Sequence, residues 1–381
     1  ADMVIGQPDF TSAVPNNGGV GPSSFFLPQG LAVDDAGNLW VCDAFNNRVL
    51  RFDNPESDAD PGIAELVIGQ FDLNSNLQNL TGDKNSPTAQ SLLFPGRVLV
   101  DDSGVYIADS GNSRVLHYAA PTENTPAADR VFGQFGSFLT RAENNDGTGA
   151  FGCCASAENM LNPIGIVVSP TGSLFVADWM NHRILRFDEP LTTDAVADAV
   201  YGQPTFTAND PNNGGADDGL TLPIDLCMDE LGNLYAADSG NHRVLRFENP
   251  MNDTLADAVY GQLGSLAGSS INHGLGPAAT DADGLFGATG VSIAPSGEIL
   301  ILDTENMRTL RYAAPALLLP GDMNCDGAVT VSDIGGFVLA LTDAAAYGVQ
   351  FPDCEITLAD VNDDDAITVS DIGPFVQLLI R

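Results

Sequence analysis

Lysine is almost absent from this 381-residue chain, which contains only one, Lys84. In total, 14 basic residues stand against 51 acidic ones, and the formal net charge is -37. A polyanion of this kind repels nucleic acid and anionic lipid and attracts divalent cations. We therefore expect no nucleic-acid partner.

Long hydrophobic runs are also missing. No apolar stretch approaches the roughly 20 residues that span a bilayer. The residues that follow Ala1 lack the basic and apolar regions of a signal peptide. We interpret the chain as a mature, exported protein without a membrane span, and we expect it to be extracellular with its signal peptide removed.

Cysteine is scarce, but its number, six, is even and permits disulfides. Cys325 and Cys354 lie near the C-terminus, where a bridge would stabilise a segment too small to build much core. Cys42 and Cys227 stand in strand patterns where sister repeats have Ala, Leu, Val or Ser, so we expect them to be buried. The sequence assigns no role to the adjacent pair Cys153 and Cys154.

A repeat organises residues 1–315. Five segments, 31–52, 98–118, 166–187, 226–247 and 291–312, read as strand, turn, strand, turn, strand. Each is preceded by a short piece that supplies a fourth strand: MVIGQ, LVIGQ, RVFGQ, AVYGQ and again AVYGQ. Four antiparallel strands per unit, repeated around an axis, describe a propeller blade.

Every repeat contains the pattern D-x-x-N-x-R. The Asp, Asn and Arg residues are Asp43, Asn46, Arg48; Asp109, Asn112, Arg114; Asp178, Asn181, Arg183; Asp238, Asn241, Arg243; and Asp303, Asn306, Arg308. On these residues the chain resembles the NHL-repeat family, whose blades carry GhAVDsxGNlYVADsxNhRIxxF. The resemblance implies an all-β, five-bladed NHL-type β-propeller of four-stranded antiparallel blades. We expect the pattern to be structural, with Asn allowing a tight turn and Asp pairing with Arg.

The two ends of the repeat array do not match. The segment Met3–Gln7 is a GQ strand without a blade before it, whereas the last repeat has no GQ strand after it. The simplest closure has Met3–Gln7 complete the last blade, and the alternative is donation to a neighbouring copy. Long inserts rich in Asn, Gly, Ser and Pro share a face with the D-x-x-N-x-R loops, where we expect a small or polymeric ligand.

Residues 316–381 contain two acidic twelve-residue loops, which we predict to form a separate calcium-binding domain. Side-chain oxygens at loop positions 1, 3, 5, 9 and 12, with a carbonyl at 7, suit Ca²⁺. We expect two Ca²⁺ sites. The predicted ligands are Asp322, Asn324, Asp326, the Ala328 carbonyl, Thr330 and Asp333, and then Asp360, Asn362, Asp364, the Ala366 carbonyl, Thr368 and Asp371.

After each loop, apolar residues fall at helical spacing. They are Ile334, Phe337, Val338, Leu341 and Ile372, Phe375, Val376, Leu379, and we expect the two halves to pack face to face. Over Gly321–Arg381 the chain resembles a type I dockerin, a small α-helical, EF-hand-like module that docks with calcium into a cohesin-like partner. Asp365 occupies position 6 of the second loop, where Gly is preferred, so weaker binding is expected there. Positions 10 and 11 are Val-Ser in both loops instead of the common Ser-Thr.

These features predict a secreted, non-catalytic scaffold protein in an extracellular assembly, whose partner is a cohesin-like protein or neighbouring copies of the same chain. No GxSxG, HExxH or GxxxxGK[ST] motif is present, and we assign no catalytic residue. The alternative is a propeller lyase or hydrolase with the module as an anchor. Some NHL propellers are lyases that hold zinc with histidines, and His182, His242 and His273 are expected on one face.

Overall fold

The computed structural model describes residues 3–56, 62–152, 154–192, 195–214, 219–314, 319–325, 329–351, 354, 356–362 and 366–379. The chain divides into two compact units, Ala1–Pro295 with Ile299–Tyr312, and Ser296–Glu298 with Ala313–Arg381. In these described ranges, no helix is long and apolar enough to cross a membrane.

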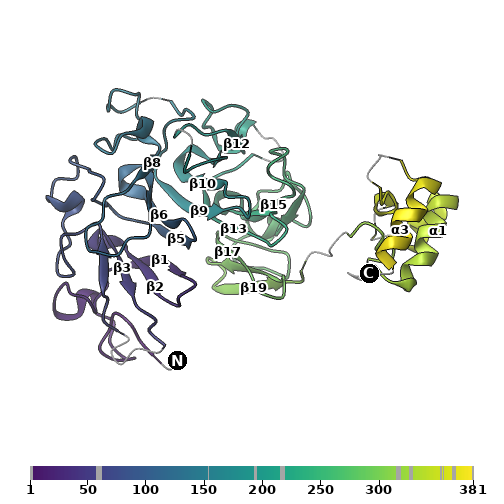
Figure 1. The fold of residues 1–381 in the computed structure, drawn as a ribbon. Helices are drawn as coiled ribbons and strands as arrows, with labels where there is room; N and C mark the ends of the chain where they lie inside the picture. The colour runs from purple at the N-terminus through teal and green to yellow at the C-terminus, as the bar shows by residue number, and fades with distance from the viewer. Residues whose placement is uncertain are drawn as a thin grey trace. The chain divides into compact units, whose positions relative to one another are not determined.

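The larger unit consists of five antiparallel sheets arranged around an axis (Figure 1). Four sheets have four strands each: β1 (Pro28–Val33), β2 (Leu39–Asp43), β3 (Arg48–Phe52) and β4 (Leu66–Ile68); β5 (Arg97–Asp101), β6 (Gly104–Asp109), β7 (Arg114–Tyr118) and β8 (Arg130–Phe132); β9 (Pro163–Val168), β10 (Leu174–Asp178), β11 (Arg183–Phe187) and β12 (Ala199–Tyr201); β13 (Pro223–Met228), β14 (Leu234–Asp238), β15 (Arg243–Phe247) and β16 (Ala258–Tyr260). The fifth sheet contains β17 (Ala288–Ile293), β18 (Ile299–Asp303) and β19 (Arg308–Tyr312). The predicted five-bladed propeller is confirmed.

The core of this unit lies between consecutive blades. Trp40 and Cys42 of the first blade, for example, share one buried cluster with Ile107 and Leu116 of the second. Similar clusters join the second blade to the third, the third to the fourth and the fourth to the fifth. The prediction that Cys42 is buried is therefore confirmed, and Cys227 is half-buried beside the fourth of these clusters.

The D-x-x-N-x-R loops hold each blade to the inserts beside it. In the third blade, Asp178 Oδ2 accepts hydrogen bonds from Arg183 Nε and from Asn181 Nδ2, both at 2.7 Å. Asp178 Oδ1 accepts from the Leu161 amide, and Arg183 also donates to the Ser156 carbonyl. The equivalent Asp–Arg distances are 2.7 or 2.8 Å in the other four blades, so the predicted structural pairing is confirmed.

The predicted reason for the Asn in this pattern is wrong. The residue that adopts the left-handed conformation is the next one, with φ between 52° and 56° at Asn47, Ser113, His182, His242 and Met307. In the first four blades the side chain of this residue accepts a hydrogen bond from a backbone amide of the following blade. Asn47 Oδ1 accepts from Phe94, His182 Nδ1 from Leu222 and His242 Nδ1 from Gly287, at 3.1 or 3.2 Å. This position therefore links consecutive blades.

The predicted closure of the last blade by Met3–Gln7 is not present. The fifth sheet has three strands, and none of the described residues 3–7 lies in a strand. Instead, Ile5 packs beside the first blade's buried cluster. Gly6 has φ +91°, and a Cβ there would overlap the Phe25 ring, while Gln7 Nε2 donates to the Val14 carbonyl at 3.0 Å. These contacts hold the segment on the first blade.

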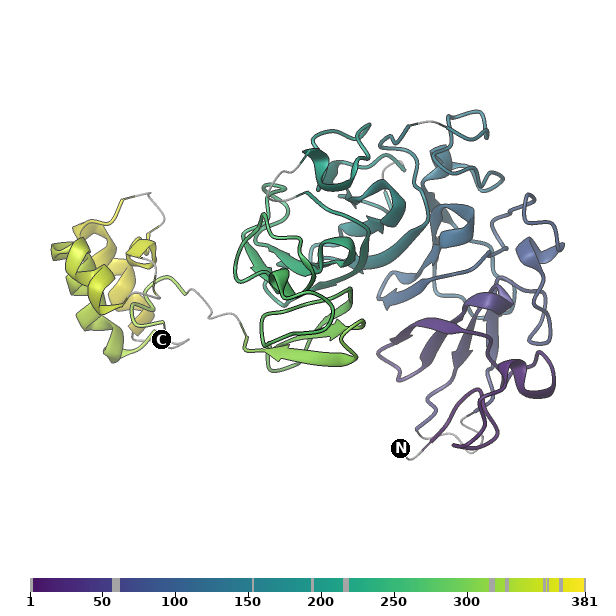
Figure 2. The same ribbon diagram turned by 180° about the vertical axis from the view of Figure 1, so that it is seen from behind.

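The smaller unit is helical and is coloured yellow to yellow-green in Figures 1 and 2. It contains α1 (Ile334–Thr342), α2 (Ala344–Gln350) and α3 (Ile372–Leu379), with short 3-10 turns η10 (Val331–Asp333), η11 (Ile356–Ala359) and η12 (Val369–Asp371). The rings of Phe337 and Phe375 stack with centroids 3.9 Å apart and planes 4° apart. The core of this unit thus forms around two Phe residues at equivalent positions, one after each acidic loop.

Candidate functional site

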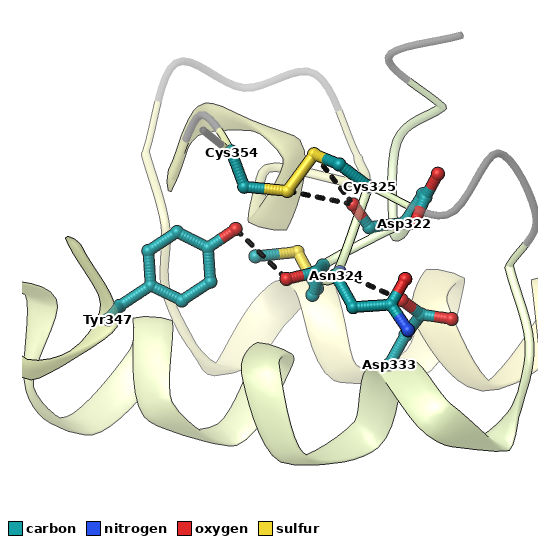
Figure 3. The surroundings of a disulfide bond; sticks show 7 residues. Asp322, Asn324, Cys325, Asp333, Tyr347 and Cys354 are labelled. Atoms are coloured by element: carbon teal, nitrogen blue, oxygen red, sulfur yellow. Dashed lines mark hydrogen bonds between the residues drawn. A yellow bond between two sulfur atoms is a disulfide. The ribbon is translucent and has the colours of Figure 1, made fainter. Parts of the chain in front are cut away.

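The first acidic loop is organised by the carboxylate at its end (Figure 3). Asp333 is fully buried, and its Oδ1 accepts from the Asn324 amide at 3.0 Å while its Oδ2 accepts from the Thr330 amide at 2.8 Å. Thr330 Oγ1 in turn accepts from the Ser332 amide, and Thr330 and Asp333 form a capping box at the start of η10, which leads into α1. The carboxylate is therefore fixed where loop and helix meet.

The second loop repeats this arrangement. Asp371 Oδ1 accepts from the Val361 and Asn362 amides at 2.9 and 3.1 Å, and its Oδ2 accepts from the Thr368 amide at 2.9 Å. Burial raises the pKa of Asp371, but the hydrogen bonds from these amides outweigh burial and hold the pKa below its usual value. The carboxylate is thus ionised at neutral pH.

Nine of the twelve predicted calcium ligands lie in the described part of the chain, and Asp326, Ala328 and Asp364 lie outside it. Within the described residues, no three His, Cys, Asp or Glu side chains form a group that could hold a metal ion. Three predicted carboxylates, those of Asp322, Asp333 and Asp371, are fully buried. A carboxylate offers about four lone-pair sites, and the amides use only two or three of those on Asp333 and Asp371. The donor chemistry therefore fits a hard cation such as Ca²⁺.

A disulfide joins Cys325 to Cys354, as the sequence suggested, with their Cα atoms 5.8 Å apart. The two sulfurs lie 3.9 and 4.0 Å from the Asp322 carbonyl oxygen (Figure 3). These are contacts only, because a disulfide sulfur has no hydrogen to donate. Tyr347 donates its hydroxyl hydrogen to the Met323 carbonyl at 3.2 Å. The beginning of the first loop is therefore held from two sides.

Apolar side chains are exposed at matching places in the two halves. We define the docking surface as Val331, Ile334, Val338, Val369, Ile372 and Val376. Val331 and Val369 are 77% and 78% exposed. The two halves meet through Phe337 and Phe375, as expected for face-to-face packing, but Ile334, Val338, Ile372 and Val376 stay exposed because these short helices bury only the face that carries the two Phe rings. The opposite face is left to solvent in both halves.

The propeller has a cavity of about 630 Å³ beside the loops η2 (Ala44–Asn46), η4 (Ser110–Asn112) and η6 (Trp179–Asn181). Its walls include Phe45, Phe94 and Trp179, with Arg141 and Glu143 as the charged residues. The sequence reasoning missed this cavity. In the sequence, the two residues between the Asp and the Asn of D-x-x-N could have indicated it. They are Ala-Phe and Trp-Met in the first and third blades, but Ser-Gly in the second and fourth.

A second feature that was missed is an ion pair between the innermost strands of the second and fourth blades. Arg97 Nη2 lies 3.0 Å from Asp225 Oδ1, and Asp225 Oδ2 accepts from the Val291 amide of the fifth blade. Burial raises the pKa of Asp225, while Arg97 opposes this shift. Arg97 and Asp225 stand at the repeat position where the other three blades have Gly. Opposite charges at this one position could have indicated the ion pair from the sequence.

The three histidines considered for zinc are not brought together. The ring nitrogens Nδ1 of His182 and His242 accept from the following blades, whereas His273 Nε2 lies 2.9 Å from Asp281 Oδ1. Burial lowers the pKa of both His182 and His242, while nearby carboxylates oppose the shift, so these rings are neutral at pH 7. Among the described residues, His182 and His242 therefore serve to link consecutive blades.

Ser103, His117 and Asp129 form a chain that resembles a nucleophilic triad. Ser103 Oγ lies 3.3 Å from His117 Nε2, and His117 Nδ1 lies 2.9 Å from Asp129 Oδ1. However, the Ser103 hydroxyl donates to Asp101 Oδ1 at 2.5 Å, and His117 is buried. The serine proton is therefore not directed at the imidazole, and the arrangement does not activate a nucleophile.

Comparison with solved structures finds two enzymes at low identity. A virginiamycin B lyase from Staphylococcus aureus is 14% identical, with a TM-score of 0.37, over 76% of this chain and 71% of that one. A gluconolactonase from Xanthomonas campestris is 17% identical, with a TM-score of 0.38, over 75% of this chain and 72% of that one.

Comparison of sequences gives a relative and a repeat family. Protein SUPPRESSOR OF QUENCHING 1, chloroplastic, from Arabidopsis thaliana is 29% identical over 182 residues, which are 47% of this chain and 16% of that protein. The match thus spans less than a fifth of the relative's length. Residues 27–52, 160–187 and 220–247 match the NHL repeat. The larger unit is therefore a five-bladed β-propeller that contains NHL repeats.

Proposed function

We propose that this protein is a secreted, non-catalytic interaction protein whose C-terminal unit binds two Ca²⁺ ions and docks the propeller into an extracellular assembly. The docking surface carries this proposal. Exposed apolar patches on soluble proteins mark interaction sites. Here three apolar residues are exposed in each half at equivalent positions, Val331, Ile334 and Val338 matching Val369, Ile372 and Val376. A cohesin-like partner or another copy of the chain would cover them.

A Ca²⁺ ion bound in each acidic loop would neutralise the carboxylates of that loop and draw their oxygens toward the ion. From residue 316 onward the chain has 11 acidic residues and one basic residue, so without cations the carboxylates repel one another. Asp333 and Asp371 already tie each loop to its helix through amide hydrogen bonds. Metal binding and the orientation of the docking surface are therefore coupled.

The test combines calcium titration with two surface variants. Calorimetry on the full chain is expected to show two Ca²⁺ per molecule. The double variant Val331→Asp, Val369→Asp is expected to weaken calcium-dependent binding to cohesin modules at least tenfold, because charge then enters an apolar interface. Val349→Asp, on α2 and outside the docking surface, is the matched control and should bind normally. A chain that takes up no calcium, or a double variant that binds as well as the control, contradicts the proposal.

A second candidate, a propeller lyase or hydrolase, is favoured by the cavity at the loop face. Its size lies in the range of small-molecule sites, and it combines aromatic walls with one Arg and one Glu. Metal analysis of the purified chain separates the two functions. About two calcium and no zinc per chain support the docking role, whereas stoichiometric zinc supports the enzyme.

A further inference from the structure

The cavity beside η2, η4 and η6 has aromatic walls that come from three different blades. The Phe45 ring of the first blade lies 5.3 Å from the Phe94 ring of the second, measured between centroids. Trp179 of the third blade lines the same cavity. Phe45 is 42% exposed and Phe94 is 38% exposed, so the propeller leaves part of each side chain uncovered. These rings offer flat apolar surface to a ligand.

Polar side chains with unused hydrogen-bonding capacity line the same cavity. They are Gln29, Glu143 and Asn162. Within the described part of the chain, none of these three side chains makes a hydrogen bond or an ion pair. The two amides can both donate and accept, and the carboxylate accepts. Together they suit a ligand whose own groups both donate and accept, as hydroxyls do.

Arg141 is the cation of the cavity, and its side chain is fixed. Its Nε and Nη2 donate to the Gly111 carbonyl at 3.3 and 3.0 Å, and its Nη1 donates to Asn85 Oδ1 at 3.4 Å. A guanidinium has five N–H donors, so these described bonds leave two of them for a ligand. Arg141 can therefore donate hydrogen bonds from a fixed position.

The insert that supplies the two charged side chains is held in place by amide hydrogen bonds. Asn144 and Asn181 are both buried and bind each other reciprocally through their side chains, at 3.0 and 2.8 Å. Gln134, which is fully buried, donates its Nε2 hydrogen to the Ala142 carbonyl at 2.8 Å. Because these walls are already in place, binding a ligand costs little conformational entropy in the protein.

The charges in and around the cavity favour a neutral ligand. The charged residues of its walls are one Arg and one Glu, whereas the net charge of the whole chain is -37. The field of the whole chain repels an anion. A cation would approach Arg141, and a purely apolar ligand would leave charged and amide groups desolvated without partners. A neutral molecule with both hydroxyl groups and apolar faces avoids all three costs.

We propose that this cavity binds a neutral oligosaccharide. The C–H face of a sugar ring packs on Phe45, Phe94 or Trp179, and the hydroxyls at the ring edge donate to Glu143 and accept from Arg141. Because the aromatic side chains come from three blades, neighbouring sugar rings can stack on different ones. The cavity volume of about 630 Å³ lies within the range of small-molecule sites.

The inference goes beyond the docking function and is independent of it. All residues that line the cavity lie between Gln29 and Met180, in the larger unit. Sugar binding should therefore be the same in calcium and in EGTA. A chain that fails the docking test can still bind a sugar, and a chain that binds no sugar can still dock.

The first experiment measures binding to the full chain by calorimetry and by tryptophan fluorescence, since Trp179 lines the cavity while Trp40 is buried elsewhere. The probes are the hexasaccharides of β-1,4-linked glucose, xylose, mannose and N-acetylglucosamine, and of α-1,4-linked glucose. At least one is expected to bind and to change the emission. Its Kd should be equal at 50 and 500 mM NaCl, because a neutral ligand has no charge to screen. Failure of all five probes to bind overturns the inference, as does binding that weakens with salt.

The second experiment locates the bound sugar with variants. Phe45→Ala and Phe94→Ala each remove a ring from the cavity wall and should weaken binding at least tenfold. Glu143→Ala breaks no side-chain bond of the described structure, so it should weaken binding without affecting the fold. Phe71→Ala, at a residue that is 60% exposed and outside the cavity, is the matched control and should bind like the wild type. Cavity variants that bind as well as this control overturn the inference.

Discussion

At the scale of single residues, one position in each blade decides how that blade meets the next. The residue after the Asn of D-x-x-N-x-R adopts a left-handed conformation, and in the first four blades its side chain accepts from a backbone amide of the following blade. Asn, Ser and His all perform this role because each offers an acceptor atom on a short side chain. The variation in residue type at this position therefore reflects several solutions to one bonding requirement.

We expect the propeller to lose stability as the pH falls below about 6.5, the ordinary histidine pKa. Burial depresses the pKa of His182 and His242 in the folded state, so the unfolded chain binds protons more readily. Their contribution to stability is present above the unfolded pKa and is lost as the pH falls through and below it. Protonation also removes the acceptor at Nδ1.

The variants His182→Asn and His242→Asn check this prediction, because Asn47 already fills the same position with a non-titrating acceptor. Urea midpoints measured at pH 7.5 and pH 5.5 should differ less in the double variant than in the wild type. An unchanged pH dependence in the double variant would assign the effect to other groups.

At the scale of elements, Gly-Gln follows each of the short fourth strands β4, β8, β12 and β16, and the glycine lets the chain turn across to the next blade. Gly202 follows β12 with φ +78°, and a Cβ at this position would lie 2.5 Å from the Leu220 side chain. Leu220 belongs to the buried cluster between the third and fourth blades. Backbone conformation and close packing both require glycine here.

Gly202→Ala is therefore expected to destabilise the propeller by about 2 to 4 kcal/mol, from left-handed strain of about 1 kcal/mol and overpacking of about 1 to 3 kcal/mol. Gly264→Ala is the matched control, since Gly264 has φ +76° and a Cβ added there would have nothing within 4 Å. Gly264→Ala should lower the stability only by the contribution of the left-handed strain. Chemical denaturation of the two variants measures the difference, and equal losses would refute the packing argument.

At the scale of the whole molecule, the two units differ in what stabilises them. The propeller has large buried clusters between blades, whereas the smaller unit has one small core, a disulfide and its acidic loops. Both tryptophans, Trp40 and Trp179, lie in the propeller, and α1, α2 and α3 lie in the smaller unit. Two optical signals therefore report on separate units.

We expect EGTA with a reducing agent to lower the thermal midpoint of the helical signal at 222 nm and to leave the midpoint of tryptophan fluorescence unchanged. Loss of calcium restores repulsion between carboxylates, and loss of the disulfide costs about 3 to 4 kcal/mol. Calcium added back under oxidising conditions is the control. A parallel shift in fluorescence would mean that the two units unfold together.

Much of the fold and part of the candidate site were accessible from local patterns. The alternation of side chains and the GQ repeats located the blades, and the spacing of carboxylates located the two acidic loops. The cavity near Phe45 and Trp179 could not be located from these patterns, because its walls come from loops distant in sequence. The Arg97–Asp225 pair was missed for the same reason, since it joins the second blade to the fourth.

The sequence by itself determined which segments become strands, which loops carry hard oxygen donors and which cysteines near the C-terminus can form a disulfide. These features depend on residues close together in the chain or on a repeated pattern. Only the tertiary structure decided which apolar residues stay exposed. Leu31 and Ile334 look like core residues in any local pattern, and their exposure depends on whether another element reaches them in space. Burial is a property of the assembled packing, so the exposure of Leu31 and the docking surface became visible only in three dimensions.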